Sequence, residues 1–195
     1  MWPSKPNKEA TEEEVLKGCL SRDRACQKAV FDRYSGRMFS LCFRYSRDKM
    51  EAEDILQEAF IRVFDSLHQF GFKGSFEGWL RRVMVTTALN HYRKKKNERM
   101  EVDMEEAVEV EKAGFDNYDS LFELKELMAM VQTLPAQYKA VFNLYAVDGY
   151  NHREIAEMLG ISESSSKSNL SRARGILQRM ITEKHNYIHG KLQQN

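Results

Sequence analysis

The sequence predicts an all-α protein made of two small helical domains that an acidic, flexible linker joins. The first observation is composition, because only three prolines and ten glycines interrupt 195 residues that are rich in helix-forming side chains. The second is spacing, because apolar residues recur at three- and four-residue steps in several windows. The third is charge: residues 71–100 carry a net +6, residues 101–126 a net −8 and residues 152–184 a net +2. We therefore expect domains at residues 11–96 and 120–184, with residues 97–119 as a solvated linker.

The first domain should open with two helices. Thr11 and Glu14 have the spacing of a capping box, which predicts a helix that ends near Leu20. A second helix is expected from about Arg24 to Tyr45. Its apolar residues step by four, four, three and four, which predicts a stripe that faces the core: Val30, Tyr34, Met38, Leu41 and Tyr45.

A third helix should begin after Asp48, with Glu51 completing another capping box. Its apolar stripe is wide and extends from Ala52 to Leu67. The opposite face is mostly acidic and comprises Glu53, Asp54, Gln57, Glu58, Arg62 and Asp65. This face is either simply solvated or a docking face for a basic partner, and charge alone does not separate the two.

A short loop from Gln69 to Ser75 precedes a fourth helix that should start near Ser75. Most of the inward positions of this helix are apolar or aromatic: Phe76, Trp79, Leu80, Val83, Ala88, Leu89 and Tyr92. Steps of four, four and three place Arg82, Thr86, Asn90 and Arg93 on a shared polar face. Aromatic rings beside such a face suit melted nucleic acid, where bases stack on rings and cations follow phosphates. The alternatives are core packing for the two N-terminal aromatics and a solvated helix end for the basic run 93–96.

The second domain contains the pattern of a helix-turn-helix between Asn151 and Arg174. Asn151 and Glu154 form a capping box, and Gly160 can take the positive φ that ends the first helix. Ser162 then caps a second helix. A helix pair of this kind places its second helix in the DNA major groove.

The two faces of that second helix differ in composition. Its core-facing residues should be Leu170, Ala173, Leu177 and either Met180 or Ile181. Its outward residues are short hydroxyls and long cations, which can contact base edges and phosphates: Ser164, Ser165, Lys167, Ser168, Ser171, Arg172 and Arg174. The alternative is a helical hairpin whose polar face is only solvated.

Several other functions lack support in the sequence. It contains no G-x-x-x-x-G-K, G-x-G-x-x-G, H-E-x-x-H or G-x-S-x-G motif, and its five histidines are scattered. Cys19, Cys26 and Cys42 make no C-x-x-C pair, so we expect reduced core thiols and neither a metal nor a cofactor. No apolar run approaches the ~20 residues of a membrane span, and the polar N-terminus is unlike a signal peptide. We therefore expect a cytoplasmic protein that is not an enzyme, with a nucleic-acid enzyme as the weakest alternative.

Several strings in order resemble the extracytoplasmic-function (ECF) sigma factors of bacterial RNA polymerase, over roughly residues 20–185. They are AEDILQEAFIRVFDSLHQF (Ala52–Phe70), FKGSFEGWLRRV (Phe72–Val83), TALNHYRK (Thr87–Lys94) and LPAQYKAVFNLY (Leu134–Tyr145), together with the opening stretch. The resemblance implies that residues 11–96 form sigma region 2, a helical bundle, and that residues 120–184 form sigma region 4, which carries the helix-turn-helix.

The resemblance also implies roles for individual residues. The acidic helix would bind the clamp helices of the polymerase β′ subunit through Asp54, Gln57 and Glu58, with Ile55 and Phe60 beneath them. The loop and fourth helix would melt the promoter −10 element and hold a flipped base, through Phe70, Lys73, Ser75, Arg82, Thr86, Asn90 and Arg93. The outward residues of the helix-turn-helix would read the −35 element as duplex. The linker would run through the RNA-exit path of the polymerase.

The implied partners are core RNA polymerase, including its β flap, promoter DNA and an anti-sigma protein, without membrane insertion. The alternative is a helix-turn-helix regulator that does not bind polymerase. The chain departs from the family pattern at two positions, where Thr86 replaces a common Asn and Ser166 replaces a common Val. We expect the Ser166 hydroxyl to bond back to the carbonyl of Ser162.

Overall fold

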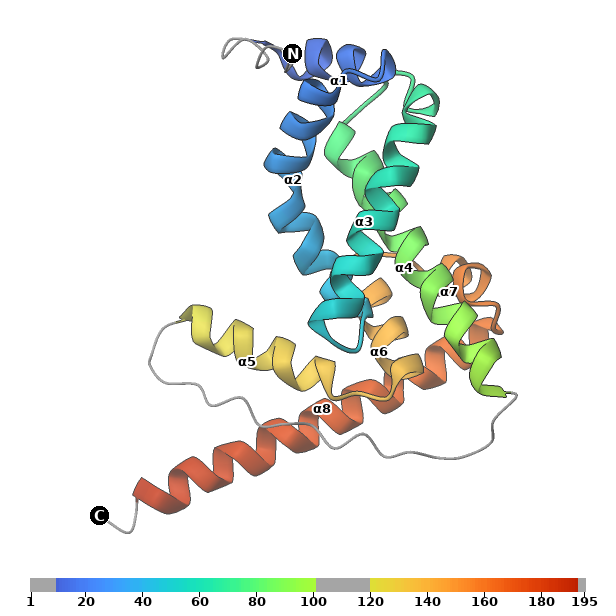
Figure 1. Cartoon of the computed structure of the whole chain (residues 1–195). Coiled ribbons are helices and arrows are strands. Elements are labelled where there is room, and N and C mark those ends of the chain that lie inside the picture. The colour runs from blue at the N-terminus through green and yellow to red at the C-terminus, as the bar shows by residue number, and fades with distance from the viewer. Residues whose placement is uncertain (1–9, 101–119, 193–195) are drawn as a thin grey trace. The chain divides into compact units, whose positions relative to one another are not determined.

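The computed structural model describes residues 10–100 and 120–192, with side chains at 10–94 and 126–184. The chain divides into two compact units between Glu101 and Val102. The described residues form helices joined by short turns, without a strand (Figure 1). None of these helices combines the length and the apolar character that crossing a membrane requires.

Unit 1 is a bundle in which three long helices pack against one another and a short one joins them (Figure 1). Its helices are α1 (Glu12–Leu20), α2 (Arg24–Tyr45), α3 (Lys49–Ser66), the 3₁₀ turn η1 (Leu67–Gln69) and α4 (Phe76–Met100). The stripe predicted for α2 is buried, from Val30 to Tyr45. α4 runs to Met100 and so includes residues 97–100, which the charge pattern assigned to the linker. Residues 101–119 of that predicted linker lie outside the described residues.

Side-chain caps fix where the first helices begin. The Thr11 side chain accepts from the backbone N–H of Glu14, whose carboxylate accepts from the Thr11 N–H at 2.8 Å, so this capping box is confirmed. At α3, Asp48 accepts from the Glu51 N–H at 2.8 Å, but the Glu51 carboxylate accepts from the N–H of Arg47 instead of that of Asp48. The second predicted capping box is therefore only half formed. The Glu51 carboxylate also accepts from the Arg47 guanidinium at 3.0 Å, and this bond holds it at residue 47 instead of residue 48.

Two of the cysteines are buried core thiols, as predicted. Cys19 and Cys42 are at most 1% exposed, and burial raises the pKa of each to about 12. The third, Cys26, is half-buried against Gly18 of α1. Among the described residues no group of three or more His, Cys, Asp or Glu side chains could hold a metal ion.

Unit 2 is built around a long C-terminal helix. Its elements are α5 (Ser120–Gln132), α6 (Ala136–Phe142), the π-helical turn η2 (Asn143–Val147), α7 (His152–Leu159) and α8 (Glu163–Leu192). α6 and α7 both pack on α8. The core contains Val131, Leu134, Ala173 and Leu177, and Ile155 at 0% exposure anchors α7. Further along α8, Met180 is half-buried and contacts Thr133, whereas Ile181 is 48% exposed, so Met180 is the inward residue of that predicted pair.

The contact between α1 and α2 predicts opposite effects for two helical glycines. A Cβ added at Gly18 would lie 2.4 Å from the Cys26 Sγ, whereas one at Gly36 would meet nothing within 4 Å. We expect Gly18→Ala to lower the free energy of unfolding of unit 1 by about 1–3 kcal/mol through overpacking. Gly36→Ala, the matched control, should raise it by about 0.5–1 kcal/mol through helix propensity. Urea unfolding followed by tryptophan fluorescence measures both, because Trp79 lies in α4 of unit 1. Equal effects of the two variants would contradict this packing.

Candidate functional site

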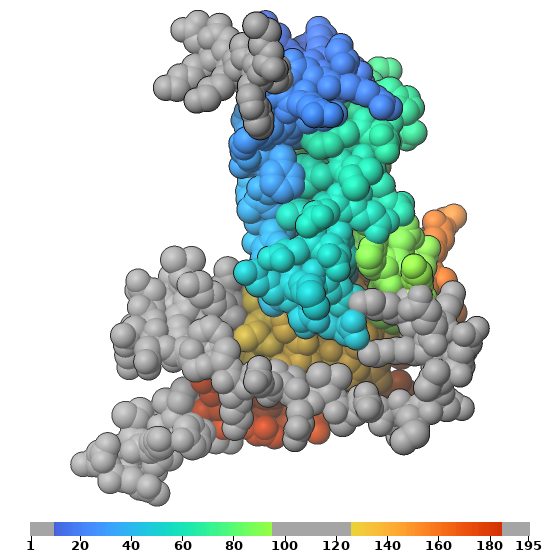
Figure 2. Space-filling view, in the orientation of Figure 1, coloured from blue at the N-terminus to red at the C-terminus, as the bar shows by residue number. Residues whose placement is uncertain are grey.

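The outward face of α3 combines polar and apolar side chains. Asp54 and Gln57 are exposed, as predicted for a docking face. Met50 and Ile61 share their stripe at helical spacing, and these two apolar side chains are 71% and 63% exposed. The surface of α3 forms a broad part of the visible face of unit 1 (Figure 2). Met50 and Ile61 were not predicted to belong to this face, although their helical spacing from Asp54 and Gln57 places them on it.

The two apolar residues predicted to lie beneath that face are core residues. Ile55 is 1% exposed and Phe60 is 3% exposed, so neither side chain reaches the surface. Phe60 packs against Phe31, with ring centroids 4.8 Å apart, and against Phe64 at 6.1 Å. They support the α3 face from beneath, as predicted, because both are on the stripe that packs against the rest of the bundle.

Glu58, at the edge of the same face, already has two partners within unit 1. Its carboxylate accepts from the Arg62 guanidinium at 2.6 and 3.0 Å and pairs with the imidazole Nε2 of His91 on α4. Burial raises the pKa of Glu58, but the hydrogen bonds from His91 and Arg62 outweigh burial and leave the pKa below its ordinary value. Glu58 therefore ties α3 to α4.

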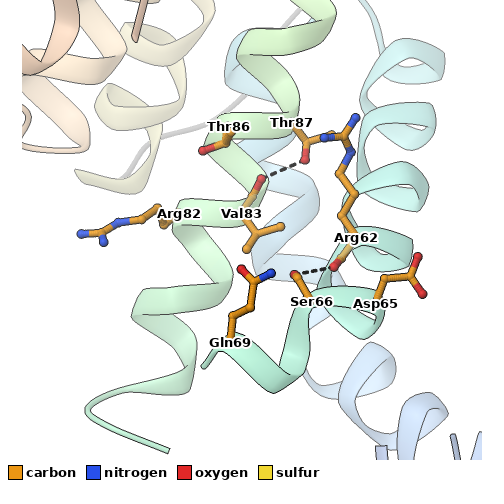
Figure 3. Close-up of a pocket in the computed structure, with 8 residues that line it drawn as sticks. All are labelled: Arg62, Asp65, Ser66, Gln69, Arg82, Val83, Thr86 and Thr87. Atoms are coloured by element: carbon orange, nitrogen blue, oxygen red, sulfur yellow. Dashed lines mark hydrogen bonds between the residues drawn. The ribbon is translucent and has the colours of Figure 1, made fainter. Parts of the chain in front are cut away.

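An open hollow of about 550 Å³ lies between the end of α3 and α4 (Figure 3). Two of the polar residues predicted on α4, Arg82 and Thr86, line it. The other lining residues are Arg62, Asp65, Ser66, Gln69, Val83 and Thr87. Figure 3 shows Ser66 and Gln69 at the end of α3 and in η1, facing α4. Sequence spacing could not find these residues as one site, because only the packing of two helices brings them together.

The loop before α4 buries one ring and exposes another. Phe70, predicted to contact DNA, is 8% exposed and packs on Phe76 and Trp79 at centroid distances of 5.6 and 5.8 Å. This prediction needs correction: Phe70 is a core anchor of the loop, because three rings converge there. Phe72 has a left-handed backbone with φ +54° and is 38% exposed, so it is the accessible ring.

The remaining predicted residues of the loop and of α4 are at the surface or half-buried. Lys73 and Ser75 are exposed, and the Ser75 hydroxyl also accepts from the N–H of Gly78 at 3.3 Å in the first turn of α4. Asn90 and Arg93 are half-buried. Of the predicted basic run 93–96, the structure describes side chains only for Arg93 and Lys94.

The helix-turn-helix is formed as the sequence predicts. Asn151 accepts from the N–H groups of Arg153 and Glu154 at 3.0 Å, and the Glu154 carboxylate accepts from the Asn151 N–H at 2.8 Å. Gly160 ends α7 in the left-handed conformation, with φ 63° and ψ 40°. The Ser162 hydroxyl accepts from the N–H of Ser165 at 3.0 Å and so caps α8.

The outward residues of α8 are exposed, apart from Ser165, which is half-buried. Three of these cations already have partners within unit 2. Lys167 forms an ion pair with Glu163 at 2.8 Å, and this hydrogen bond lowers the pKa of Glu163. Arg172 donates to the Tyr138 hydroxyl at 3.3 Å, and the Arg174 guanidinium lies 5.6 Å from the centroid of the Tyr145 ring.

Ser166 is buried on the inward face of α8, as predicted, but its hydroxyl bonds elsewhere. The expected bond to the Ser162 carbonyl is replaced by one to the imidazole Nδ1 of His152, at 2.9 Å. The Ser162 carbonyl instead accepts from the backbone N–H of Ser166 at 3.0 Å, as in any helix. The spacing of the residues did not predict a role for His152, because only the fold of the two helices brings it to Ser166.

Comparison with known proteins gives two family matches. The model described as Sigma-70 region 2 matches residues 30–98, and the model described as Sigma-70, region 4 matches residues 124–177. Together they span most of both units.

Curated relatives from three organisms resemble the chain. It is 31% identical over 145 residues to the ECF RNA polymerase sigma factor SigE of Mycolicibacterium smegmatis, over 72% of this chain and 56% of SigE. It is 28% identical over 165 residues to the ECF RNA polymerase sigma factor SigW of Bacillus subtilis, over 79% of this chain and 88% of SigW. It is 26% identical over 178 residues to the ECF RNA polymerase sigma-E factor of Escherichia coli K12, over 86% of this chain and 93% of that protein.

Among solved structures, the fold resembles that of the sigma factor RpoE from Bartonella quintana, crystallised with the anti-sigma factor NepR. The TM-score is 0.51 at 20% sequence identity, over 80% of this chain and 96% of RpoE. This likeness supports a shared all-α fold.

The pairing of Glu58 predicts a pH-dependent contribution to stability. Because folding lowers the pKa of Glu58, its contribution is present above the ordinary value of about 4.3 and is lost as pH falls through the lowered pKa. We expect Glu58→Gln to destabilise unit 1 by about 0.5–1 kcal/mol at pH 7, a small effect because the side chain is 38% exposed. At pH 3 the difference should shrink, as measured by urea unfolding with tryptophan fluorescence. Glu53→Gln, which breaks only an exposed pair with Lys49, is the control; a pH-independent difference for Glu58→Gln would contradict the assignment.

Proposed function

Because the chain belongs to the extracytoplasmic-function sigma factors of bacterial RNA polymerase, we propose that it binds core polymerase and directs initiation at specific promoters. The observation that carries this proposal is that one chain combines a helix-turn-helix with a second unit that has both an acidic docking face and an open polar hollow. A regulator that only binds duplex DNA needs the helix-turn-helix of unit 2 and has no use for the face and hollow of unit 1. The family is not an enzyme class, so the polymerase catalyses RNA synthesis and this protein does not. The protein acts in the cytoplasm, where the polymerase works.

The proposal assigns a separate task to each part of the chain. Residues 11–96 act as region 2, which binds polymerase and opens the −10 element, and residues 120–184 act as region 4, which binds the −35 element and the β flap. Residues 101–119, which follow α4, join them as an acidic linker. The two family matches, at residues 30–98 and 124–177, support this division.

The α3 face is the proposed contact with the β′ clamp helices. Asp54 and Gln57 supply charge and hydrogen bonds, while Met50 and Ile61 supply apolar area that water leaves on docking. Glu58 can join this contact only by sharing its carboxylate with Arg62 or His91, which hold it within unit 1. We therefore assign Glu58 mainly to the α3–α4 contact.

The hollow between α3 and α4 is the proposed site for an unpaired base of the −10 element. Extruding a base costs a few kcal/mol of stacking, which contacts in the pocket must offset. Arg82 can hold the backbone phosphate, and Thr86 offers one hydroxyl where an Asn would offer an amide with both a donor and an acceptor. A different base preference from that of family members with Asn follows at this position. Lys73, Ser75, Asn90 and Arg93 flank this path along the loop and α4.

The outward face of α8 is the proposed reader of the −35 duplex. Its hydroxyls and cations can contact base edges and phosphates in the major groove. The pairing of Lys167 with Glu163 and of Arg172 with Tyr138 orders two of these side chains before DNA arrives. We further propose an anti-sigma protein as a partner that covers the binding faces, as the name of the RpoE complex indicates for that protein.

The deciding experiment mixes the purified chain with core polymerase and a promoter library and sequences the transcripts that start. The proposed function predicts initiation at a defined set of promoters with shared −35 and −10 elements. Duplex binding without polymerase binding or initiation would instead make the protein a helix-turn-helix regulator, and the absence of any sequence preference would exclude both.

The exposed apolar residues of α3 predict a loss of polymerase affinity on substitution. We expect Ile61→Ser to weaken the complex with core polymerase about tenfold, because an apolar anchor at the interface loses its burial. The matched control is Leu20→Ser at the end of α1, an aliphatic side chain that is 42% exposed, does not belong to α3 and should leave affinity unchanged. Fluorescence anisotropy of labelled chain measures both, and circular dichroism checks the fold. Equal affinities of the two variants would remove α3 from the interface.

A further inference from the structure

The hydrogen bond between Ser166 and His152 joins the two helices of the helix-turn-helix. Ser166 is the fourth residue of α8 and is fully buried, whereas its neighbours on the inward face, Leu170 and Ala173, are apolar. A buried hydroxyl that lacks a partner costs about 1–3 kcal/mol. His152 is the first residue of α7, so this one bond of 2.9 Å joins the start of the first helix to the start of the second.

The imidazole of His152 continues the connection to a third element. It stacks on the ring of Tyr145, with centroids 4.6 Å apart and planes inclined by 22°. Tyr145 lies in the π-helical turn η2 and is 37% exposed. The backbone of η2 follows directly from α6, which itself packs on α8. The position of the Tyr145 ring is therefore fixed from two sides, by its own helix and by His152.

The same ring lies against a cation on the outward face of α8. The Arg174 guanidinium is 5.6 Å from the Tyr145 centroid, within the range of a cation–π interaction. Among the described residues no carboxylate forms an ion pair with Arg174, so its charge remains available to a phosphate. A series of contacts thus connects Ser166, in the first turn of α8, through His152 and Tyr145 to Arg174. Ser166 and Arg174 are eight residues apart, which is about 12 Å along the helix.

We infer that His152 is a positioning residue for DNA recognition, which holds Arg174 against a DNA phosphate through Tyr145 and fixes α8 against α7 through Ser166. This inference rests on the proposed function, and it names side chains that the helix-turn-helix pattern alone does not assign. Hydroxyl and imidazole suit each other here, because a hydroxyl can donate to a neutral Nδ1 or accept from a protonated one. A valine at position 166 could do neither.

The test uses the salt dependence of promoter binding by the full chain assembled with core polymerase. Each phosphate contact contributes about 0.9 to the slope of log affinity against log salt concentration. Arg174→Ala should lower the slope by about this amount. His152→Ala should lower it by nearly the same amount, because Tyr145 then loses the ring that holds it against Arg174. In the Arg174→Ala background, His152→Ala should change the slope no further.

Two further variants separate positioning from folding. Tyr145→Leu leaves positions 152 and 166 untouched and should lower the slope as His152→Ala does, even if the latter fails to fold. His152→Phe with Ser166→Val replaces the hydrogen bond by an apolar contact and keeps a ring on Tyr145, so the pair should recover most of the slope that His152→Ala loses. A purely structural role would lower the melting temperature of His152→Ala and leave its slope at the wild-type value, which would overturn the inference. Wild-type chain that fails to bind any promoter would instead overturn the proposed function itself.

Discussion

Burial of the inner face of α3 is the constraint on which unit 1 depends. Ala52, Ile55, Ala59 and Val63 are at most 1% exposed and recur at three- and four-residue steps, so one continuous stripe packs against both α2 and α4. The two alanines let neighbouring helices approach closely. Once this stripe is inside, helix geometry leaves no choice about which side chains face outward. The proposed docking face on α3 is therefore a consequence of the core rather than an independent feature.

The same constraint determines the electrostatics between α3 and α4. Glu58 lies at the edge of the buried stripe, where its carboxylate meets His91 of α4 and Arg62 one turn ahead. Arg62 in turn lines the hollow. The proposed polymerase contact and the proposed base pocket are thus adjacent in space and share a side-chain network, although the strings that suggest them are separate in the sequence.

The features that the sequence predicts correctly are those that depend on interactions between residues close together in the chain. The ends of α1 and α7, the left-handed Gly160 and the inward face of α8 follow from caps and periodicity over a few residues, and the structure confirms them. The hollow, the Glu58–His91 pair and the His152–Ser166 bond join residues that only tertiary packing brings together, so no spacing rule could find them. Phe70 shows the converse error: a string shared with a family includes the side chains beneath a surface as well as those on it.

The bond between His152 and Ser166 limits how this protein can be re-engineered. Recognition helices are attractive cassettes for chimeric regulators, since a dozen residues can carry a sequence preference from one scaffold to another. Moving only residues 163–177 would bury the Ser166 hydroxyl opposite whatever side chain the host has at the start of its own first helix, and would leave Arg174 without its aromatic support. The smallest portable segment is therefore residues 145–174, from the ring in η2 to the cation that it holds.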